Sequence, residues 1–123
     1  MQEKNILIVE DNEALQESMQ IYLGTRNFRI VQARSVDQAL QLLQKETPDV
    51  ILLDLLLPEK NGIVLLESLQ EKKSSIPVIV ITNMETTDMR EHCLQAGARD
   101  VLIKSNTSLP SLTQLIMRYC GNG

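Results

Sequence analysis

The chain has 123 residues, enough for one domain and too few for two independent hydrophobic cores. Hydrophobic residues make up 43% of it and charged residues 23%, which excludes a disordered or fibrous protein. The formal net charge of -4 argues against direct nucleic-acid binding, because phosphate groups need a clustered positive field. We expect a single globular domain over residues 1–123.

The sequence predicts neither a secretory leader nor a membrane span. Residues 1–4 lead into a short apolar run without a small-residue cleavage site. The longest apolar stretch, 50–57, is interrupted by Asp54 and is far shorter than the roughly 20 residues that span a bilayer. Cys93 and Cys120 lack the spacing of metal ligands and the density of a disulfide scaffold. These features predict a cytoplasmic protein with reduced thiols and no membrane partner.

Five short runs rich in Ile, Val and Leu recur along the chain, each followed by apolar residues at three- and four-residue spacing. The runs predict strands at 5–9, 29–32, 50–53, 78–81 and 101–103. Most of them are continuously apolar, which indicates a parallel sheet with helices on both faces. The prediction is an α/β fold of five strands and five helices.

The predicted helices carry start and stop signals of their own. Ser35, with Gln38 three residues later, resembles a capping box, and Ser108 stands before a proline near the first turn of the last helix. Gly97 is expected to stop the fourth helix. From the first helix to the fifth, the expected buried stripes are Leu15, Met19 and Tyr22; Val36, Ala39, Leu40 and Leu43; Ile63, Leu66 and Leu69; Met89, Cys93 and Ala96; and Leu112, Leu115, Ile116 and Tyr119.

Polar residues stand where four of the predicted strands end. Glu10 and Asp11 follow the first strand, Asp54 the third, Thr82 the fourth and Lys104 the fifth. In an open parallel sheet the carboxyl ends of the strands share one edge, and ligands bind where the strand order reverses. With the order 2-1-3-4-5 that point lies between the first and third strands. We therefore expect the three carboxylates in one crevice, with Thr82 and Lys104 closing its other side.

Three carboxylates in one crevice repel one another, and burying them costs stability unless a cation or proton intervenes. An all-oxygen site with room for water suits magnesium. Magnesium beside a carboxylate nucleophile, an ammonium and a hydroxyl provides what phosphoryl transfer to an aspartate requires. The pattern thus predicts Glu10, Asp11 and Asp54 as metal ligands, and Asp54, Thr82 and Lys104 as the catalytic groups.

Taken singly, four of these residues have a structural explanation. Asp11 could cap a helix, Glu10 and Lys104 could be solvated charges, and Thr82 could end a strand or cap the next helix. Asp54 differs, because a carboxylate inside an apolar run has no structural reason to be there. The joint placement of all five residues at strand ends favours function.

Four segments of the sequence resemble, in order and spacing, the receiver domain of bacterial two-component response regulators. They are ILIVED at 6–11, DLLLP at 54–58 with Gly62 beyond it, VIVIT at 78–82 and AGARDVLIK at 96–104. The resemblance extends over nearly the whole chain and implies a flavodoxin-like fold with the sheet order 2-1-3-4-5.

The resemblance also implies roles for single residues. Glu10, Asp11, Asp54 and the main-chain carbonyl of Leu56 would hold Mg2+, Asp54 would accept the phosphoryl group, and Thr82 and Lys104 would contact it. The implied partners are a sensor histidine kinase or phosphotransfer protein and a downstream protein target or fused output domain, and a homodimer is compatible with it. Such a domain catalyses only its own phosphorylation and dephosphorylation.

Three positions depart from the family pattern. Ser105 stands where a proline, often in a cis bond, usually follows the lysine, so the loop after Lys104 is expected to be more mobile or to take another geometry. Val101 replaces an aromatic residue, which removes a ring-flip switch. Asn83 replaces a smaller residue and is expected to narrow access to Asp54.

Two further positions bear on the lifetime of a phosphorylated form. Leu56 and Met84, two residues after Asp54 and Thr82, are apolar where the faster-hydrolysing relatives often carry polar groups. Neither side chain can orient an attacking water by hydrogen bonding, which predicts a long-lived phosphoprotein.

Three other interpretations stay open on the sequence. A receiver-like interaction module that is never phosphorylated is suggested by the departures and opposed by the intact metal and acceptor residues. A haloacid-dehalogenase-like phosphatase needs a second acid two residues after its nucleophile, where Leu56 stands. A flavin-binding flavodoxin needs a phosphate loop after the first strand, where Glu10, Asp11 and Glu13 would repel a phosphate.

Overall fold

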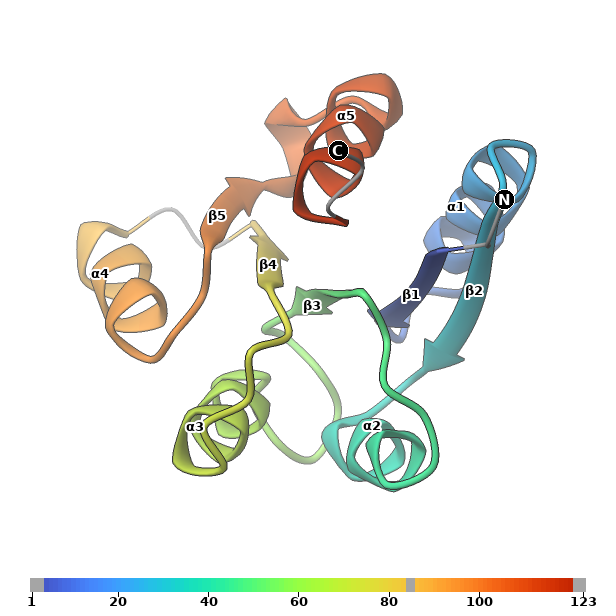
Figure 1. Cartoon of the computed structure of the whole chain (residues 1–123). Coiled ribbons are helices and arrows are strands. Elements are labelled where there is room, and N and C mark those ends of the chain that lie inside the picture. Colours follow the sequence, from blue (N-terminus) through green and yellow to red (C-terminus); the bar gives the residue numbers. More distant parts are fainter. Residues whose placement is uncertain (1–3, 84–85, 121–123) are drawn as a thin grey trace.

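The computed structural model describes residues 4–83 and 86–120 of the chain. Within these residues five strands and five α-helices alternate (Figure 1). The strands are β1 (Lys4–Val9), β2 (Phe28–Ala33), β3 (Val50–Asp54), β4 (Val78–Thr82) and β5 (Asp100–Ile103). The helices are α1 (Glu13–Gly24), α2 (Val36–Leu43), α3 (Ile63–Glu71), α4 (Thr87–Gln95) and α5 (Leu109–Tyr119), and a 3₁₀ turn at Lys104–Asn106 precedes α5.

All strand pairs are parallel, and the sheet order is β2-β1-β3-β4-β5. Helices α1 and α5 cover one face of the sheet, and α2, α3 and α4 cover the other (Figure 1). The order reverses between β1 and β3, because the chain first builds outward to β2 and then returns to the other side of β1. The predicted α/β fold and its strand order are confirmed.

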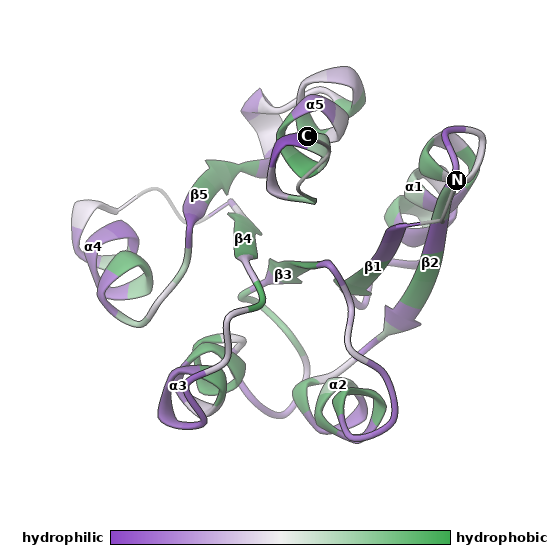
Figure 2. Ribbon diagram, in the orientation of Figure 1, coloured by the Kyte–Doolittle hydropathy of each residue, from purple (hydrophilic) through white to green (hydrophobic). Residues whose placement is uncertain are grey.

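Alternate residues of the inner strands enter two separate hydrophobic cores, one on each face of the sheet. In β1, Leu7 and Val9 belong to the core under α2, α3 and α4, whereas Ile6 and Ile8 belong to the core under α1 and α5. The same alternation runs through β3 and β4, every residue of which is buried. Burial on both faces explains why these strands are continuously apolar in sequence (Figure 2).

The predicted helical stripes pack on these cores, with a shift in two helices. In α1 the buried positions are Gln16, Met19 and Leu23, whereas Leu15 and Tyr22 are only partly buried. In α3 an additional leucine is buried and the first residue, Ile63, is partly buried. In α2, α4 and α5 six expected members are buried, namely Val36, Ala39, Cys93, Ala96, Leu112 and Ile116. The expected Leu40, Leu43, Met89, Leu115 and Tyr119 are only partly buried, and Thr113 of α5 is buried in addition.

The predicted start and stop signals lie at helix ends, but the capping box at Ser35 is only half formed, because the Gln38 side chain accepts from the Arg34 N–H at 2.7 Å and not from the Ser35 N–H. The Ser35 hydroxyl accepts a hydrogen bond from the Gln38 N–H at 3.1 Å, and the Ser108 hydroxyl accepts from the Ser111 N–H at 3.2 Å. Helix α4 ends just before Gly97, which has a φ of 110°, a left-handed conformation that favours glycine.

Two other helices begin at caps that are not the candidate site residues. The Asn12 side chain, not that of Asp11, caps α1 by accepting from the Leu15 N–H at 3.0 Å. Thr86, four residues beyond Thr82, caps α4. The capping explanations for Asp11 and Thr82 are therefore wrong.

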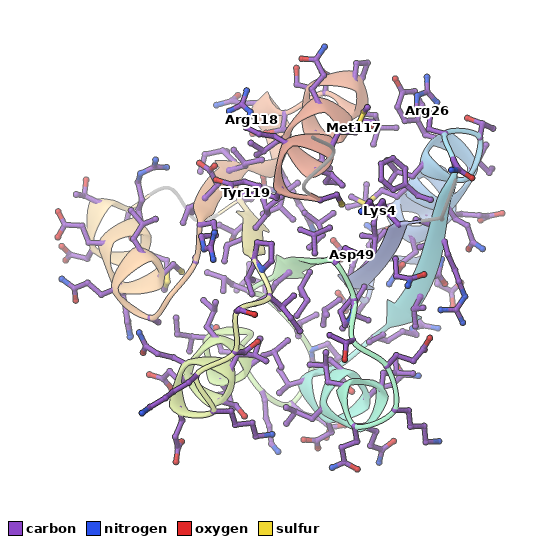
Figure 3. All side chains as sticks on the ribbon, in the orientation of Figure 1. Lys4, Arg26, Asp49, Met117, Arg118 and Tyr119 are labelled. Atoms are coloured by element: carbon purple, nitrogen blue, oxygen red, sulfur yellow. The ribbon has the colours of Figure 1, made fainter. Side chains whose placement is uncertain are left out.

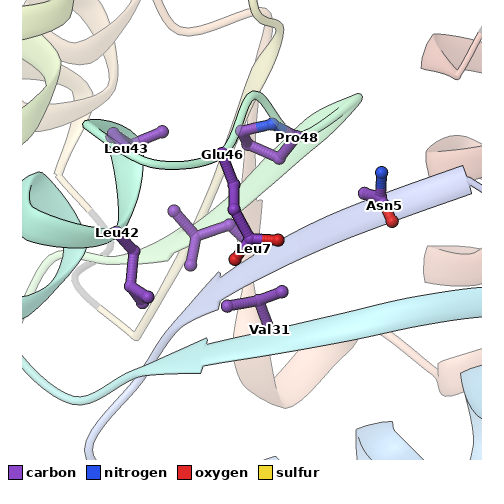
Figure 4. A pocket seen from close by; sticks show the side chains of 7 residues that line it. All are labelled: Asn5, Leu7, Val31, Leu42, Leu43, Glu46 and Pro48. Atoms are coloured by element: carbon purple, nitrogen blue, oxygen red, sulfur yellow. The ribbon is translucent and has the colours of Figure 1, made fainter.

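Polar contacts join the elements at the amino end of the sheet, opposite the edge where the candidate site residues stand. The Tyr119 hydroxyl of α5 donates to Asp100 of β5 at 2.8 Å, and Asp49 accepts from the Asn5 N–H at 2.7 Å. Figure 3 labels Tyr119 and Asp49 among the side chains. A small pocket lies at this end, lined by Asn5, Leu7, Val31, Leu42, Leu43, Glu46 and Pro48 (Figure 4). The pocket is mostly apolar and opens near the amino ends of the strands. None of the candidate site residues lines it.

The structure also bears on the predictions about the cysteines and about membrane-spanning segments. Cys93 and Cys120 are both buried and are not joined in a disulfide. Among the described residues, every helix is too short or too polar to cross a bilayer.

Candidate functional site: an acidic crevice at the carboxyl edge of the sheet

Three carboxylates meet at the point where the strand order reverses. Val9, the last residue of β1, lies beside Leu53 of β3, so Glu10 and Asp54 leave neighbouring strands at the same level. Oxygen atoms of Glu10, Asp11 and Asp54 all lie within 4.8 Å of one another. The structure thus brings together the three acids that the sequence places at two strand ends.

The three carboxylates differ in exposure. Glu10 and Asp54 are only 2% and 4% exposed, whereas Asp11 is exposed. Two buried carboxylates lose hydration, and their mutual repulsion is not screened by water as it would be at the surface. The exposed Asp11 leaves the outer side of the crevice open to solvent.

Lys104 is the positive charge that faces the buried acids. Its Nζ lies 2.7 Å from Glu10 Oε1 and donates to Asp54 Oδ2 at 3.0 Å. Burial by itself lowers the pKa of Lys104, but the close contacts with Glu10 and Asp54 and their negative charges together outweigh burial and raise it. Since β4 separates β5 from β3, the long lysine side chain crosses above the end of β4 to reach both acids.

Glu10 is buried beside Lys104, and its carboxyl group has therefore lost most of its contact with water. Burial raises the pKa of Glu10, while the hydrogen bonds from Lys104 and from the Asn12 N–H, at 3.0 Å, act in the opposite direction. The net direction is upward, so removal from water is the dominant effect at this carboxyl group.

Thr82 occupies the position between the acid and the lysine. It is the last residue of β4, is fully buried and lies beside Ile103, the residue before Lys104. Asp54 pairs with Ile81, so Thr82 stands one residue beyond the level of Asp54. Its hydroxyl thus comes from the strand that separates Asp54 from Lys104.

The loop after β3 is held close to the end of that strand. The Leu56 N–H donates to Asp54 Oδ1 at 3.1 Å, whereas the Leu56 side chain is 53% exposed. Gly62 packs against the same strand, and a Cβ atom there would lie 2.5 Å from the main-chain oxygen of Asp54. The close approach explains the glycine, because any side chain would push the loop away from Asp54.

The donor set fits a hard divalent cation. All three acids offer oxygen atoms, which magnesium prefers, and an ion with only a few protein ligands retains waters on its open side. Lys104 provides the compensating charge for the two buried acids in the structure as it stands. Glu10, Asp11 and Asp54 therefore form an acidic cluster of the kind that binds magnesium.

Two positioning contacts were missed by sequence reasoning. The buried Gln16 side chain donates from Nε2 to the carbonyls of Glu10 at 2.7 Å and Ala33 at 3.2 Å, which joins the ends of β1 and β2. Its spacing of three residues from Met19 was the available signal, because it places a polar side chain on the buried face of α1. Asn83 Oδ1 accepts from the Ser105 N–H at 3.1 Å, a long-range contact without a local signal.

The loop after Lys104 takes a geometry that differs from a cis-proline turn. Residues Lys104–Asn106 form a 3₁₀ turn, and none of the described peptide bonds is cis. The expectation of another geometry for this loop therefore agrees with the structure. Met84, one of the two apolar residues tied to phosphoprotein lifetime, lies outside the described residues.

Comparison with known proteins identifies the family. The model of the response regulator receiver domain matches residues 6–116. A cyclic di-GMP phosphodiesterase of Thermotoga maritima is 34% identical over 80% of this chain and 26% of its own length. The Regulator of RpoS of Escherichia coli is 32% identical over 92% of this chain and 34% of its own length. The chain thus spans about a third or less of the length of these two relatives.

The solved structures agree with the sequence comparison. The BeF3-activated N-terminal receiver domain of Klebsiella pneumoniae RstA has a TM-score of 0.84 and 27% identity, with 94% of this chain and 98% of that one covered. Strand order, acidic crevice and sequence match all lead to one conclusion. The chain belongs to the response regulator receiver domain family of two-component signalling.

Proposed function

We propose that Asp54 is the phosphoacceptor of this receiver domain and takes its phosphoryl group from a phosphohistidine of a sensor kinase or phosphotransfer protein. The observation that supports this most directly is the burial of Asp54 at the reversal point of the sheet, with an ammonium group 3.0 Å away. A carboxylate in that position is shielded from competing solvent yet faces a crevice where a phosphoryl group can enter.

Glu10, Asp11, Asp54 and the main-chain carbonyl of Leu56 would hold magnesium. When bound, the ion supplies positive charge to the oxygens of the transferred group and offsets the repulsion among the acids. The exposed Asp11 and the solvent on its side provide the access that such an ion needs.

The other steps of phosphoryl transfer would be carried out by residues of the chain itself. An oxygen of Asp54 forms the new bond to phosphorus as the phosphorus–nitrogen bond of the donor breaks, and that electron pair returns to the imidazole. The Leu56 N–H holds Asp54 Oδ1 and so limits rotation of the carboxylate. Lys104 exchanges one carboxylate contact for a phosphoryl oxygen, and Thr82 donates its hydroxyl to another.

The switch requires partners on both sides of the reaction. A sensor histidine kinase or phosphotransfer protein supplies the phosphoryl group, and a downstream protein or a fused output domain responds to the altered surface. We place this single domain in the cytoplasm, with no nucleic acid bound by the domain itself. Its catalysis is confined to its own phosphorylation and dephosphorylation.

The test is covalent labelling by acetyl phosphate with magnesium, followed by intact-mass measurement. The wild type should gain one phosphoryl group, and Asp54→Asn should gain none. Asp88→Asn, which removes an exposed carboxylate at the start of α4, is the matched control and should label like the wild type. A wild type that stays unlabelled, also with histidine kinases as donors, would instead support a receiver-like interaction module.

A further inference from the structure

Two departures from the family pattern meet in space. Asn83 follows β4, Ser105 lies in the turn after β5, and the Asn83 Oδ1 atom accepts a hydrogen bond from the Ser105 N–H at 3.1 Å. A proline at position 105 has no N–H and could not make this bond. The bond therefore depends on both residues.

The contact continues the pairing of β4 and β5 beyond the end of the sheet. The last register pair of these strands is Thr82 with Ile103. Beyond that pair a side chain, and not the main chain of a strand, joins the two segments. Asn83 therefore holds together the two loops that leave the site.

The contact lies next to Lys104 in the chain. Before Lys104, the main chain is fixed by the pairing of Ile103 with Thr82. After it, the Ser105 N–H is held by Asn83. The ammonium group must reach Glu10 and Asp54 from this anchored backbone, across the width of β4.

We infer that Asn83 is a positioning residue for Lys104, and that its bond to Ser105 supplies the restraint on the lysine loop that a proline ring would otherwise provide. The inference rests on the proposed function of Asp54. Without the bond, the turn after Lys104 samples more conformations, and the ammonium group spends less time where the phosphoryl oxygens are.

The experiment measures the rate of labelling by acetyl phosphate at saturating donor and magnesium. Asn83→Ala should lower the rate constant about 3- to 10-fold, the effect of losing one hydrogen bond of ordinary strength. The magnesium dissociation constant, measured by calorimetry, should stay within about twofold, because the Asn83 side chain bonds to Ser105 and, within the part of the chain that the structure describes, to none of the three acids. Asn106→Ala alters an exposed asparagine of the same turn and should label like the wild type.

Double variants separate positioning from a general structural effect. In a Lys104→Ala background, Asn83→Ala should have no further effect, because it acts through the lysine. In a Ser105→Pro background it should also be silent, because the donor of the bond is already gone. Additive losses in either background would overturn the inference.

Hydrogen exchange provides a readout that does not depend on phosphorylation. The Ser105 amide should exchange slowly in the wild type and in Asn106→Ala, and faster in Asn83→Ala. A wild type that never labels refutes the proposed function of Asp54. A wild type that labels, with Asn83→Ala labelling equally fast or Ser105 exchanging equally fast in both, refutes only the role of Asn83.

Discussion

Single residues at the acidic crevice show how buried charges are balanced before any ion binds. Glu10 and Asp54 lose hydration in the crevice, and the ammonium of Lys104 contacts both of them. A buried ion pair contributes little net stability, but removing one partner leaves an uncompensated charge and is costly. Lys104 is therefore expected to stabilise the metal-free fold in addition to the role in phosphoryl transfer that we propose for it.

Lys104→Met should lower the free energy of unfolding without magnesium by about 2 to 4 kcal/mol, because both buried acids lose their partner. Saturating magnesium should recover most of the loss, since the ion takes over the compensation. Urea unfolding with a chelator and with magnesium measures both values. Lys60→Met, which removes an exposed lysine paired with Asp37, is the control and should cost at most about 1 kcal/mol. A variant as stable as the wild type without magnesium would contradict this account.

Leu56→Asn should shorten the lifetime of the phosphorylated protein several-fold. Leu56 is half-exposed, its main-chain N–H bonds to Asp54, and its side chain has no polar group, whereas an amide at this position could orient an attacking water. Loss of the label is followed by intact mass after the phosphodonor is removed. The control is Leu94→Asn. Leu94 is also partly exposed but lies on α4, and its replacement should leave the lifetime unchanged. Equal decay of both variants and the wild type would refute the role of Leu56.

At the scale of elements, the connection from β3 to α3 determines how closely the loop that carries Leu56 approaches the end of β3. Gly62 immediately precedes α3, and its N–H donates to the Leu55 carbonyl at 2.8 Å. Helix α3 therefore begins directly against the end of β3. The packing of one helix start thus controls the position of the loop that carries Leu56.

Gly62→Ala should destabilise the fold by about 1 to 3 kcal/mol and slow labelling, because the new Cβ meets the Asp54 oxygen at 2.5 Å. Gly24→Ala is the matched control, since a Cβ atom at the end of α1 has no neighbour within 4 Å. It should be neutral or stabilise by up to about 1 kcal/mol. Urea unfolding of the two variants provides the comparison, and equal stabilities would show that the loop yields easily.

At the scale of the whole molecule, one sheet supports two cores, and α5 closes the second of them. Cys120, the residue after α5, belongs to that core together with residues of β1, β3 and β4. Burial raises the pKa of the Cys120 thiol from its ordinary value of 9.0 to about 11, and the nearby charge of Asp49 acts in the same direction. The stability of the entire fold is therefore linked to pH through this thiol.

Between about pH 9 and pH 11 the unfolded chain loses the Cys120 proton while the folded protein keeps it. The folded state then binds more protons than the unfolded state, so the free energy of unfolding falls as pH rises through this window. Cys120→Ala should have lower stability at neutral pH but a shallower decline above pH 9. Urea unfolding across the window checks the slope, and parallel curves for the two proteins would contradict the shift.

The sequence alone was sufficient for the features that depend on neighbours along the chain. Continuous apolar runs indicated strands buried on both faces, and three- and four-residue spacing indicated the helices between them. Ser35 and Ser108 were recognisable as caps, because a capping side chain bonds to a backbone N–H only three residues away. The parallel topology then placed Glu10, Asp11 and Asp54 at one edge.

Only the tertiary structure decided the contacts between groups that are remote in sequence. It paired Lys104 with Glu10 and Asp54, and it joined Asn83 to Ser105. Each remote contact depends on distances between strands and loops that packing sets, and these distances leave no periodic signal in the chain. Local periodicity and capping chemistry therefore determine the elements and the edge where the acids meet, whereas three-dimensional packing determines which charges and amides bond there.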